Sequence, residues 1–139
     1  MIDVRRLRTD YDAVHAALSR RGGDVGAQLD RARQLDERQR ELVAQRDELR
    51  ARVKGLSKEV GLLRRDGRVD EAEKVQAQSR ELGAQEAAID AEVDGVAADL
   101  RDLLLRIPNI PADDVPDGVS DADNPVLRTV GFDPDCYGE

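Results

Sequence analysis

The stretch Leu35–Leu63, LDERQRELVAQRDELRARVKGLSKEVGLL, carries the pattern that decides the fold. Its leucines fall seven residues apart, at Leu35, Leu42, Leu49, Leu56 and Leu63. Val53 and Val60 hold the alternate position, four residues after the preceding leucine, as in a heptad coiled coil. Gln39 and Arg46 hold that alternate position nearer the start of the stretch, where we expect looser or hydrated packing.

A second apolar seam follows the turn-forming pair Asp66-Gly67. Spaced alternately by four and three, its residues are Val75, Ser79, Leu82, Glu86, Ile89, Val93, Val96, Leu100, Leu103 and Ile107. Two heptad helices joined by a few residues must run antiparallel, because a short connection cannot return the chain to its starting end. About 35 residues on each side, at about 1.5 Å per residue, predict a rod of roughly 50 Å. The polar seam residues predict where the rod bends: Gln39, Arg46, Ser79 and Glu86.

The flanks of this hairpin differ from it and from each other. Residues 1–23 predict a short amphipathic helix with its apolar side chains at Tyr11, Val14, Ala17 and Leu18, capped by Thr9 or Asp10 and ended by Arg20-Arg21-Gly22-Gly23. After Ile107, an extended connector is predicted by Pro108, Pro111, Pro116 and Pro125, with one short strand formed by Val126, Leu127 and Val130.

The predicted fold is therefore all-α: a long antiparallel two-helix coiled-coil hairpin with short N-terminal helices at its base and an extended C-terminal connector. We expect an N-terminal helical base over residues 1–28 and a coiled-coil arm over 29–107 with its tip near 64–70. The connector covers 108–139. With 2% aromatic residues, no Trp and 37% charged residues, the composition suits long solvated helices and not a thick globular core.

The sequence also excludes several classes of site. The single cysteine, Cys136, cannot form an internal disulfide, and the single histidine, His15, lies at no metal-binding spacing from it, so we assign neither a role. No signal peptide or membrane span is present, which predicts a cytoplasmic protein without a membrane partner. These residues contain no catalytic centre and no cofactor site.

The net charge of −8 is unevenly distributed along the chain. Residues 31–80 hold fourteen basic and ten acidic side chains, whereas residues 81–139 hold three and fifteen. Local potential steers association more than total charge does, so the basic middle is where an anionic partner is expected.

Four segments together resemble the N-terminal domain of seryl-tRNA synthetases. They are Met1-Ile2-Asp3-Val4 with Leu7-Arg8, then Leu56-Ser57-Lys58-Glu59-Val60-Gly61, then Glu81-Leu82-Gly83, and an exit block of Leu103–Pro111 followed by Val115-Pro116-Asp117-Gly118 and Asp123-Asn124. The exit block is the most specific, because heptads alone fit many proteins. The resemblance covers almost the whole chain.

The resemblance implies the tRNA-binding arm of a serine-tRNA ligase, a class II aminoacyl-tRNA synthetase of protein biosynthesis. In that family the arm reaches across a homodimer and grips the elbow and long variable arm of serine tRNA, and no DNA is bound. It also implies a catalytic domain that uses ATP and Mg and lies outside these residues, so we expect the chain to be a piece of a longer protein. The alternatives are a free-standing regulatory tRNA-binding module and a plain coiled-coil scaffold that binds protein.

The leucine register places the candidate tRNA contacts on and beside one outward face. They are Arg50, Lys54, Ser57, Lys58, Arg64, Arg65 and Arg68, of which Arg64 and Arg68 flank the tip. The alternative is that these cations are ordinary solvated side chains paired with Glu48, Glu59, Asp66 or Asp70.

Three further residues near this face have structural interpretations. Arg46, in the seam, predicts a packed stem with a solvated head, and so a structural role. Gly61 and Gly83 allow close approach either of RNA or of the second helix, and we favour the helix for Gly83.

Overall fold

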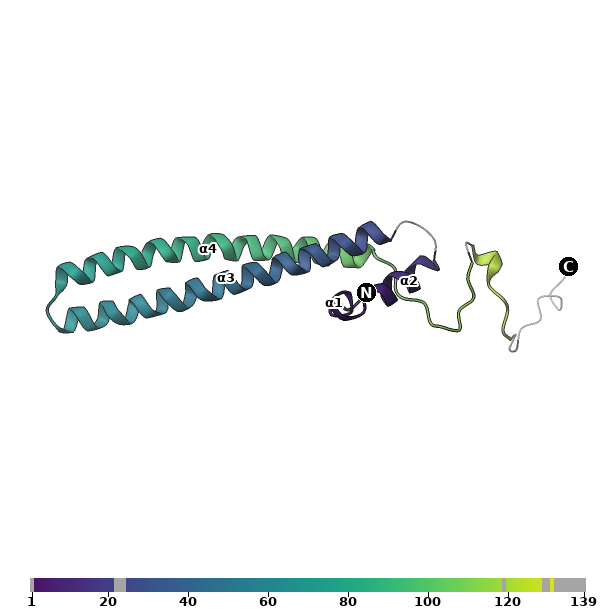
Figure 1. Ribbon diagram of the computed structural model, residues 1–139, viewed down its shortest axis with the longest axis horizontal. Coiled ribbons are helices and arrows are strands. Elements are labelled where there is room, and N and C mark those ends of the chain that lie inside the picture. Colours follow the sequence, from purple (N-terminus) through teal and green to yellow (C-terminus); the bar gives the residue numbers. More distant parts are fainter. Residues whose placement is uncertain (1, 22–24, 119, 129–130, 132–139) are drawn as a thin grey trace.

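The computed structural model describes residues 2–21, 25–118, 120–128 and 131. They form α1 (Arg6–Thr9), α2 (Tyr11–Ser19), α3 (Gly26–Arg65) and α4 (Val69–Arg106), with a 3-10 turn at Asp121–Asp123. The long helices α3 and α4 run antiparallel along a rod, with α1 and α2 at its base (Figure 1). The predicted all-α hairpin is thus confirmed. No helix in these described ranges is long and apolar enough to cross a membrane.

The apolar seam holds the two long helices together. Every seam residue predicted on either helix is buried or half-buried, and the polar ones, Gln39, Arg46, Ser79 and Glu86, are all half-buried. The helices contain 40 and 38 residues, so at about 1.5 Å per residue the rod is roughly 60 Å long. The rod is longer than the estimate from the sequence because α3 begins at Gly26, before the first heptad leucine.

The tip of the hairpin closes through a Schellman motif. The backbone N–H of Arg68 donates to the carbonyl of Leu63 at 2.9 Å, and that of Gly67 donates to the carbonyl of Arg64 at 3.3 Å. Gly67 has φ +74°, the left-handed conformation that only glycine adopts without strain. The predicted Asp-Gly turn is therefore confirmed, and its backbone bonds satisfy carbonyls that the end of α3 leaves unpaired.

A compact core fastens the N-terminal helices to the base of the rod. It consists mainly of Ile2, Leu7, Val14, Leu18, Val25, Leu29, Ala32, Leu35, Leu100, Leu104 and Ile107, contributed by α1, α2, α3 and the end of α4. Asp36 is the only buried charged residue in the described ranges. His15 is exposed at this end, and its ring stacks on Tyr11 with centroids 6.1 Å apart.

The helix predicted over Tyr11–Leu18 is confirmed, but the cap predicted for it is wrong. Asp10 both ends α1 and precedes α2, and with φ −134° and ψ 35° its side chain makes no capping hydrogen bond. Thr9 is also not the cap, because its hydroxyl donates to the carbonyl of Arg5. One backbone position serves both helices, so the extended conformation that an N-cap normally uses is not available.

The connector leaves α4 at Ile107 and is tied back to the end of α2. Arg20 Nε donates to Asp117 Oδ1 at 2.6 Å, and Arg21 Nη1 donates to the carbonyl of Asn109 at 3.0 Å. These arginines were expected only to end the helix. They do follow its last residue, Ser19, and also bind the chain that returns from α4. Gly22, Gly23 and Cys136 lie outside the described residues.

The strand predicted for Val126 and Leu127 is wrong. Both are almost fully exposed, at 82% and 93%, and neither lies in a strand. Val130 lies outside the described residues. A single extended segment finds no partner here for its backbone groups, and without a partner strand a β-pattern in the sequence does not form a sheet.

Candidate nucleic-acid interface

The candidate contacts on α3 form two rows that differ in the contacts they make within the hairpin. Arg50, Ser57 and Arg64 are seven residues apart and lie directly beside the seam, and we call them the inner row. Lys54, Lys58 and Arg65 lie farther round the helix, and we call them the outer row. All six are exposed. In a coiled coil, positions beside the seam reach the partner helix, whereas those farther round face solvent.

The inner row is already engaged within the hairpin. Arg50 Nε donates to Glu86 Oε1 on α4 at 2.8 Å, and Arg64 Nη2 donates to Gln76 Oε1 at 2.8 Å. The hydroxyl of Ser57 donates to the carbonyl of Val53, one turn earlier, at 2.9 Å. Arg50 is therefore partly neutralised by Glu86, while Arg64 keeps its full charge because its partner is neutral.

The outer row carries free positive charge. Lys54, Lys58 and Arg65 make no ion pair with any residue in the described ranges. The pairing that the sequence suggested as an alternative, with Glu48, Glu59, Asp66 or Asp70, is not seen for these three. A cation with no protein partner is available to a phosphate without first breaking an ion pair.

Arg68 at the tip is paired within its own helix turn. Its Nε donates to Glu71 Oε1 at 2.8 Å and its Nη2 donates to Glu71 Oε2. These hydrogen bonds hold the pKa of Glu71 below its ordinary value and raise that of Arg68, and the Coulombic attraction of the pair acts in the same direction. Arg68 therefore presents less free charge than its place at the tip suggested.

Nearer the base, the arginines of α3 are taken up by acidic residues of α4. Arg38 reaches Glu92 at 2.6 Å and Arg46 reaches Asp90 at 3.1 Å, in addition to the Arg50–Glu86 pair. With its side chain only 22% exposed, Arg46 has the structural role predicted for it. These ion pairs join the two helices and neutralise Arg38, Arg46 and Arg50 with acidic residues of α4.

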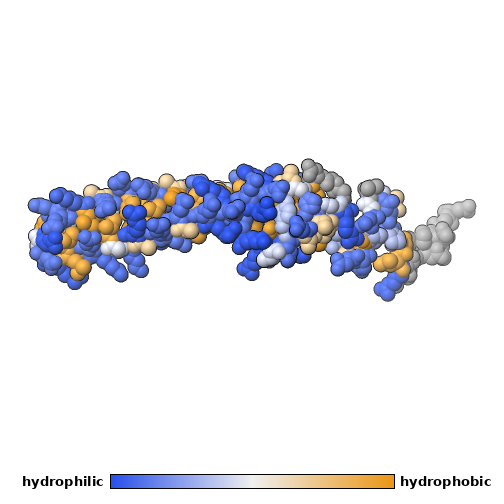
Figure 2. Space-filling view, viewed as in Figure 1, coloured by the Kyte–Doolittle hydropathy of each residue, from blue (hydrophilic) through white to orange (hydrophobic). Residues whose placement is uncertain are grey.

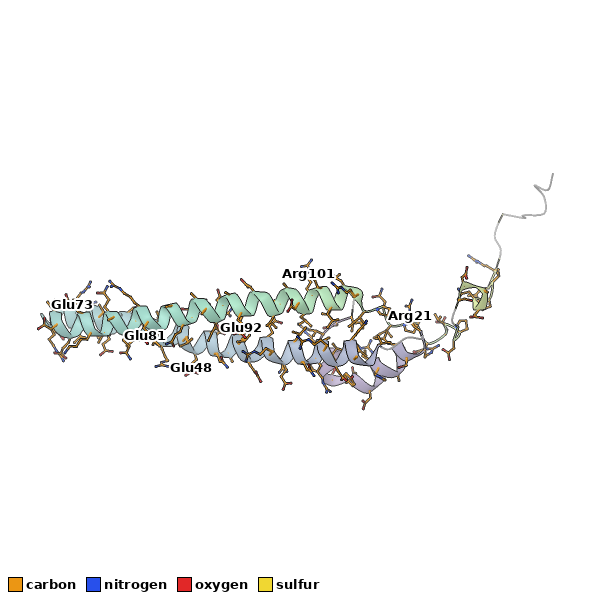
Figure 3. All side chains as sticks on the ribbon, turned by 90° about the horizontal axis from the view of Figure 1, so that it is seen from above. Arg21, Glu48, Glu73, Glu81, Glu92 and Arg101 are labelled. Carbon is orange, nitrogen blue, oxygen red and sulfur yellow. The ribbon has the colours of Figure 1, made fainter. Side chains whose placement is uncertain are left out.

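The two long helices carry opposite charge. α3 contains eleven basic and seven acidic residues, and α4 contains four and ten. Acidic side chains run along α4 from the tip half toward the base, among them the labelled Glu73, Glu81 and Glu92 (Figure 3). Among the described residues of α3 and α4, most cations that make no ion pair lie in the tip half, between residues 51 and 80: Arg52, Lys54, Lys58, Arg64, Arg65, Lys74 and Arg80.

Sequence reasoning overlooked some exposed residues of this tip half. Arg52, Lys74 and Arg80 have the same exposure and lack of ion pairs as the outer row. The sequence does contain a pattern that indicates these three residues, because each lies off the apolar seam in the basic middle of the chain. Leu62 and Val69 are 56% and 55% exposed beside the tip turn, where Figure 2 shows an apolar patch at the end of the rod.

The glycines in the tip half are not sites of close helix contact. A Cβ added at Gly61 or Gly83 would meet no other atom within 4 Å, so the close helix approach favoured for Gly83 is wrong. Long side chains beside the seam reach the partner helix, but the backbone of such a position does not approach that helix closely. Both glycines therefore leave open space on the surface of the hairpin.

Known proteins that resemble this chain share one activity. The family model of the seryl-tRNA synthetase N-terminal domain matches residues 1–111. The serine–tRNA ligase of Exiguobacterium sibiricum is 41% identical, and that of Rhizobium etli strain CIAT 652 is 40% identical, each match covering 96% of this chain and 31% of the relative. The crystal structure of seryl-tRNA synthetase from Pyrococcus horikoshii, complexed with ATP, matches with a TM-score of 0.78 and 26% identity, over 88% of this chain and 27% of that one. The chain thus spans less than a third of the length of these relatives.

Proposed function

Because this chain belongs to the seryl-tRNA synthetase N-terminal domain family, we propose that it is the tRNA-binding arm of a serine-tRNA ligase. In this proposal the hairpin grips the elbow and long variable arm of serine tRNA. The grip positions the acceptor end for a catalytic domain that lies outside these residues. The proposed domain has three parts: the base (1–28), the arm (29–107) and the connector (108–139).

The observation that carries the proposal is the concentration, in the tip half of the rod, of cations that make no ion pair within the described residues. Double-stranded RNA is recognised mainly through its phosphates, its ribose hydroxyls and its shape, because its major groove is too narrow for side chains. A helical face that presents Lys54, Lys58 and Arg65 with no ion pair in the described ranges suits such a target. Arg50, Ser57, Arg64 and Arg68 join the interface through the donor and acceptor positions that their internal hydrogen bonds leave unused.

The remaining chemistry belongs to the parent enzyme. Since the chain spans 31% of the length of the Exiguobacterium sibiricum relative, serine activation with ATP and Mg is proposed for the rest of the parent enzyme, as a homodimer. Exposed apolar side chains at the end of α4 and in the connector support a contact with a further domain: Leu105 at 61%, Val126 at 82% and Leu127 at 93%. The connector, tied back by Arg20, fixes the direction in which the chain leaves the rod.

A binding titration tests this function. The chain is titrated with serine tRNA and with the same tRNA shortened in its variable arm, each at two salt concentrations. We expect tighter binding to the long-armed tRNA and a clear fall in affinity with salt, because bound cations release counterions from the phosphates. Equal and salt-insensitive binding to both RNAs, or no binding to either, overturns the proposal and favours a coiled-coil module that binds protein.

A further inference from the structure

A groove lies between α3 and α4 in the tip half of the rod. It has a volume of about 270 Å³ and is lined by Ser57, Val60, Gln76, Ser79 and Arg80. It exists because Ser79 holds a seam position where Val75 and Leu82 are its neighbours along the seam. A serine fills less of the seam than a leucine, so the helices leave an opening opposite Val60. Space left unfilled between packed helices lowers stability, so Ser79 costs the hairpin packing energy that a leucine would supply.

The lining of the groove offers both hydrogen-bond donors and acceptors. The Ser57 hydroxyl donates to the carbonyl of Val53, and its lone pairs can still accept a bond. The amide oxygen of Gln76 accepts from Arg64, which leaves the amide NH₂ of Gln76 facing no partner among the described residues. The hydroxyl of Ser79 has no hydrogen-bond partner in the same described ranges.

One cation stands at the edge of this polar lining. Arg80 is exposed and makes no ion pair within the described part of the chain. Arg64, bound to Gln76, places a second positive charge on the same side of the hairpin. The groove therefore combines neutral groups that donate and accept hydrogen bonds with cations at its rim.

We propose that this groove seats one ribose-phosphate unit of the RNA backbone and recognises its 2′-hydroxyl. The inference rests on the proposed function and assigns to it a specific contact on α4. A 2′-hydroxyl both donates and accepts, as the lining requires, and it distinguishes RNA from DNA at a given site. Arg80 binds the adjoining phosphate, a contact that positions the backbone and carries no sequence information.

The test compares two RNA hairpins with the sequence of the long variable arm of serine tRNA. One has ordinary riboses, and the other has 2′-fluoro riboses, which keep the A-form helix but cannot donate a hydrogen bond. We expect the intact chain to bind the ordinary hairpin more tightly than the 2′-fluoro hairpin, by about fivefold for each hydrogen bond that the 2′-fluoro hairpin cannot make. Ser79→Leu fills the groove, so it removes this preference while raising Tm. Arg80→Gln weakens binding of both hairpins equally and lowers the salt slope by about one.

Gln39→Leu is the matched control, because it also fills a half-buried polar seam position but lies on α3 toward the base. It should raise Tm and leave the preference for the ordinary hairpin intact. The groove is not a ribose site if Ser79→Leu retains the preference, or if the unaltered chain binds both hairpins equally with a strong salt dependence. Neither result contradicts the proposed function as a tRNA-binding arm. If the unaltered chain binds neither hairpin and no serine tRNA, the proposed function itself fails.

Discussion

Arg8 of α1 holds Asp36 of α3 through two hydrogen bonds, from Nε to Oδ2 at 2.7 Å and from Nη2 to Oδ1 at 2.6 Å. The Asp36 side chain is 4% exposed and the Arg8 side chain is 39% exposed. A second arginine, Arg40, approaches the same carboxylate at 3.3 Å. This bidentate pair joins the N-terminal helices to the base of the rod, and its two ends differ in their access to water.

Because the two side chains differ in exposure, replacing Asp36 and replacing Arg8 should lower the free energy of unfolding by different amounts. Asp36→Asn leaves an arginine that water can reach, and should lower the free energy of unfolding by about 1–2 kcal/mol. Arg8→Met leaves a buried carboxylate with only Arg40 beside it, and should lower the urea midpoint further. Urea unfolding followed by circular dichroism measures both. Equal midpoints, or a larger loss for Asp36→Asn, would contradict this account.

Two glycines predict opposite outcomes for the same substitution. Gly67→Ala places a Cβ on a residue at φ +74° and should destabilise the hairpin by about 1 kcal/mol. Gly61→Ala lies within α3, where the new Cβ meets no other atom, and should stabilise it by roughly 0.5–1 kcal/mol. Thermal unfolding of both variants checks the signs. A stabilising Gly67→Ala would show that the tip turn does not hold this conformation in solution.

A substitution at Arg46 should change stability without changing RNA binding. Arg46→Leu completes the apolar seam and leaves Asp90, whose side chain is 47% exposed, free to be solvated. Replacing a partly buried ion pair by an apolar side chain is often stabilising, so Tm should rise by a few degrees. Affinity for serine tRNA should stay unchanged. A large loss of affinity would place Arg46 in the interface instead of the seam.

The outer row predicts a loss of electrostatic binding. Lys54→Gln, Lys58→Gln and Arg65→Gln together should lower the slope of log affinity against log salt by about 2, since each phosphate contact contributes about 0.7–0.9. The control combines Arg31→Gln, Arg101→Gln and Arg106→Gln, which removes the same charge from unpaired arginines near the base. Filter binding of serine tRNA at four salt concentrations gives both slopes. Equal slopes for the two triple variants would mean that total charge, and not position, governs binding.

The Arg68–Glu71 pair predicts a pH dependence at the tip. The pKa of Glu71 is lowered in the folded chain, chiefly by the hydrogen bonds from Arg68. The stabilisation by this pair is thus present above the unfolded glutamate pKa of about 4.3 and is lost as pH falls through the lowered folded value. An NMR titration of the Glu71 carboxyl should show this low pKa, and Arg68→Gln should return it to the ordinary range. An ordinary pKa for Glu71 in the unaltered chain would show that the Arg68–Glu71 pair does not form in solution.

Much of the fold was predictable because coiled-coil packing is periodic. Leucines seven residues apart identified the seam, and the Asp66-Gly67 pair located the tip, since both signals act over a few residues along the chain. The base was less predictable. Asp10 has the residue type of a helix cap, yet α1 ends at the same position and prevents it from acting as one. Val126 and Leu127 have strand propensity, but propensity does not supply a partner strand.

The candidate interface divides in the same way. The sequence by itself determined the hairpin, its tip and the basic middle, because these depend on periodicity and composition. Only the tertiary structure decided which cations are free, since Arg50 meets Glu86 and Arg64 meets Gln76 across the seam, at separations of 36 and 12 residues along the chain. The groove beside Ser79 likewise required the structure. Whether a small seam residue leaves an opening depends on what the opposite helix brings to it, and no pattern within one helix contains that information.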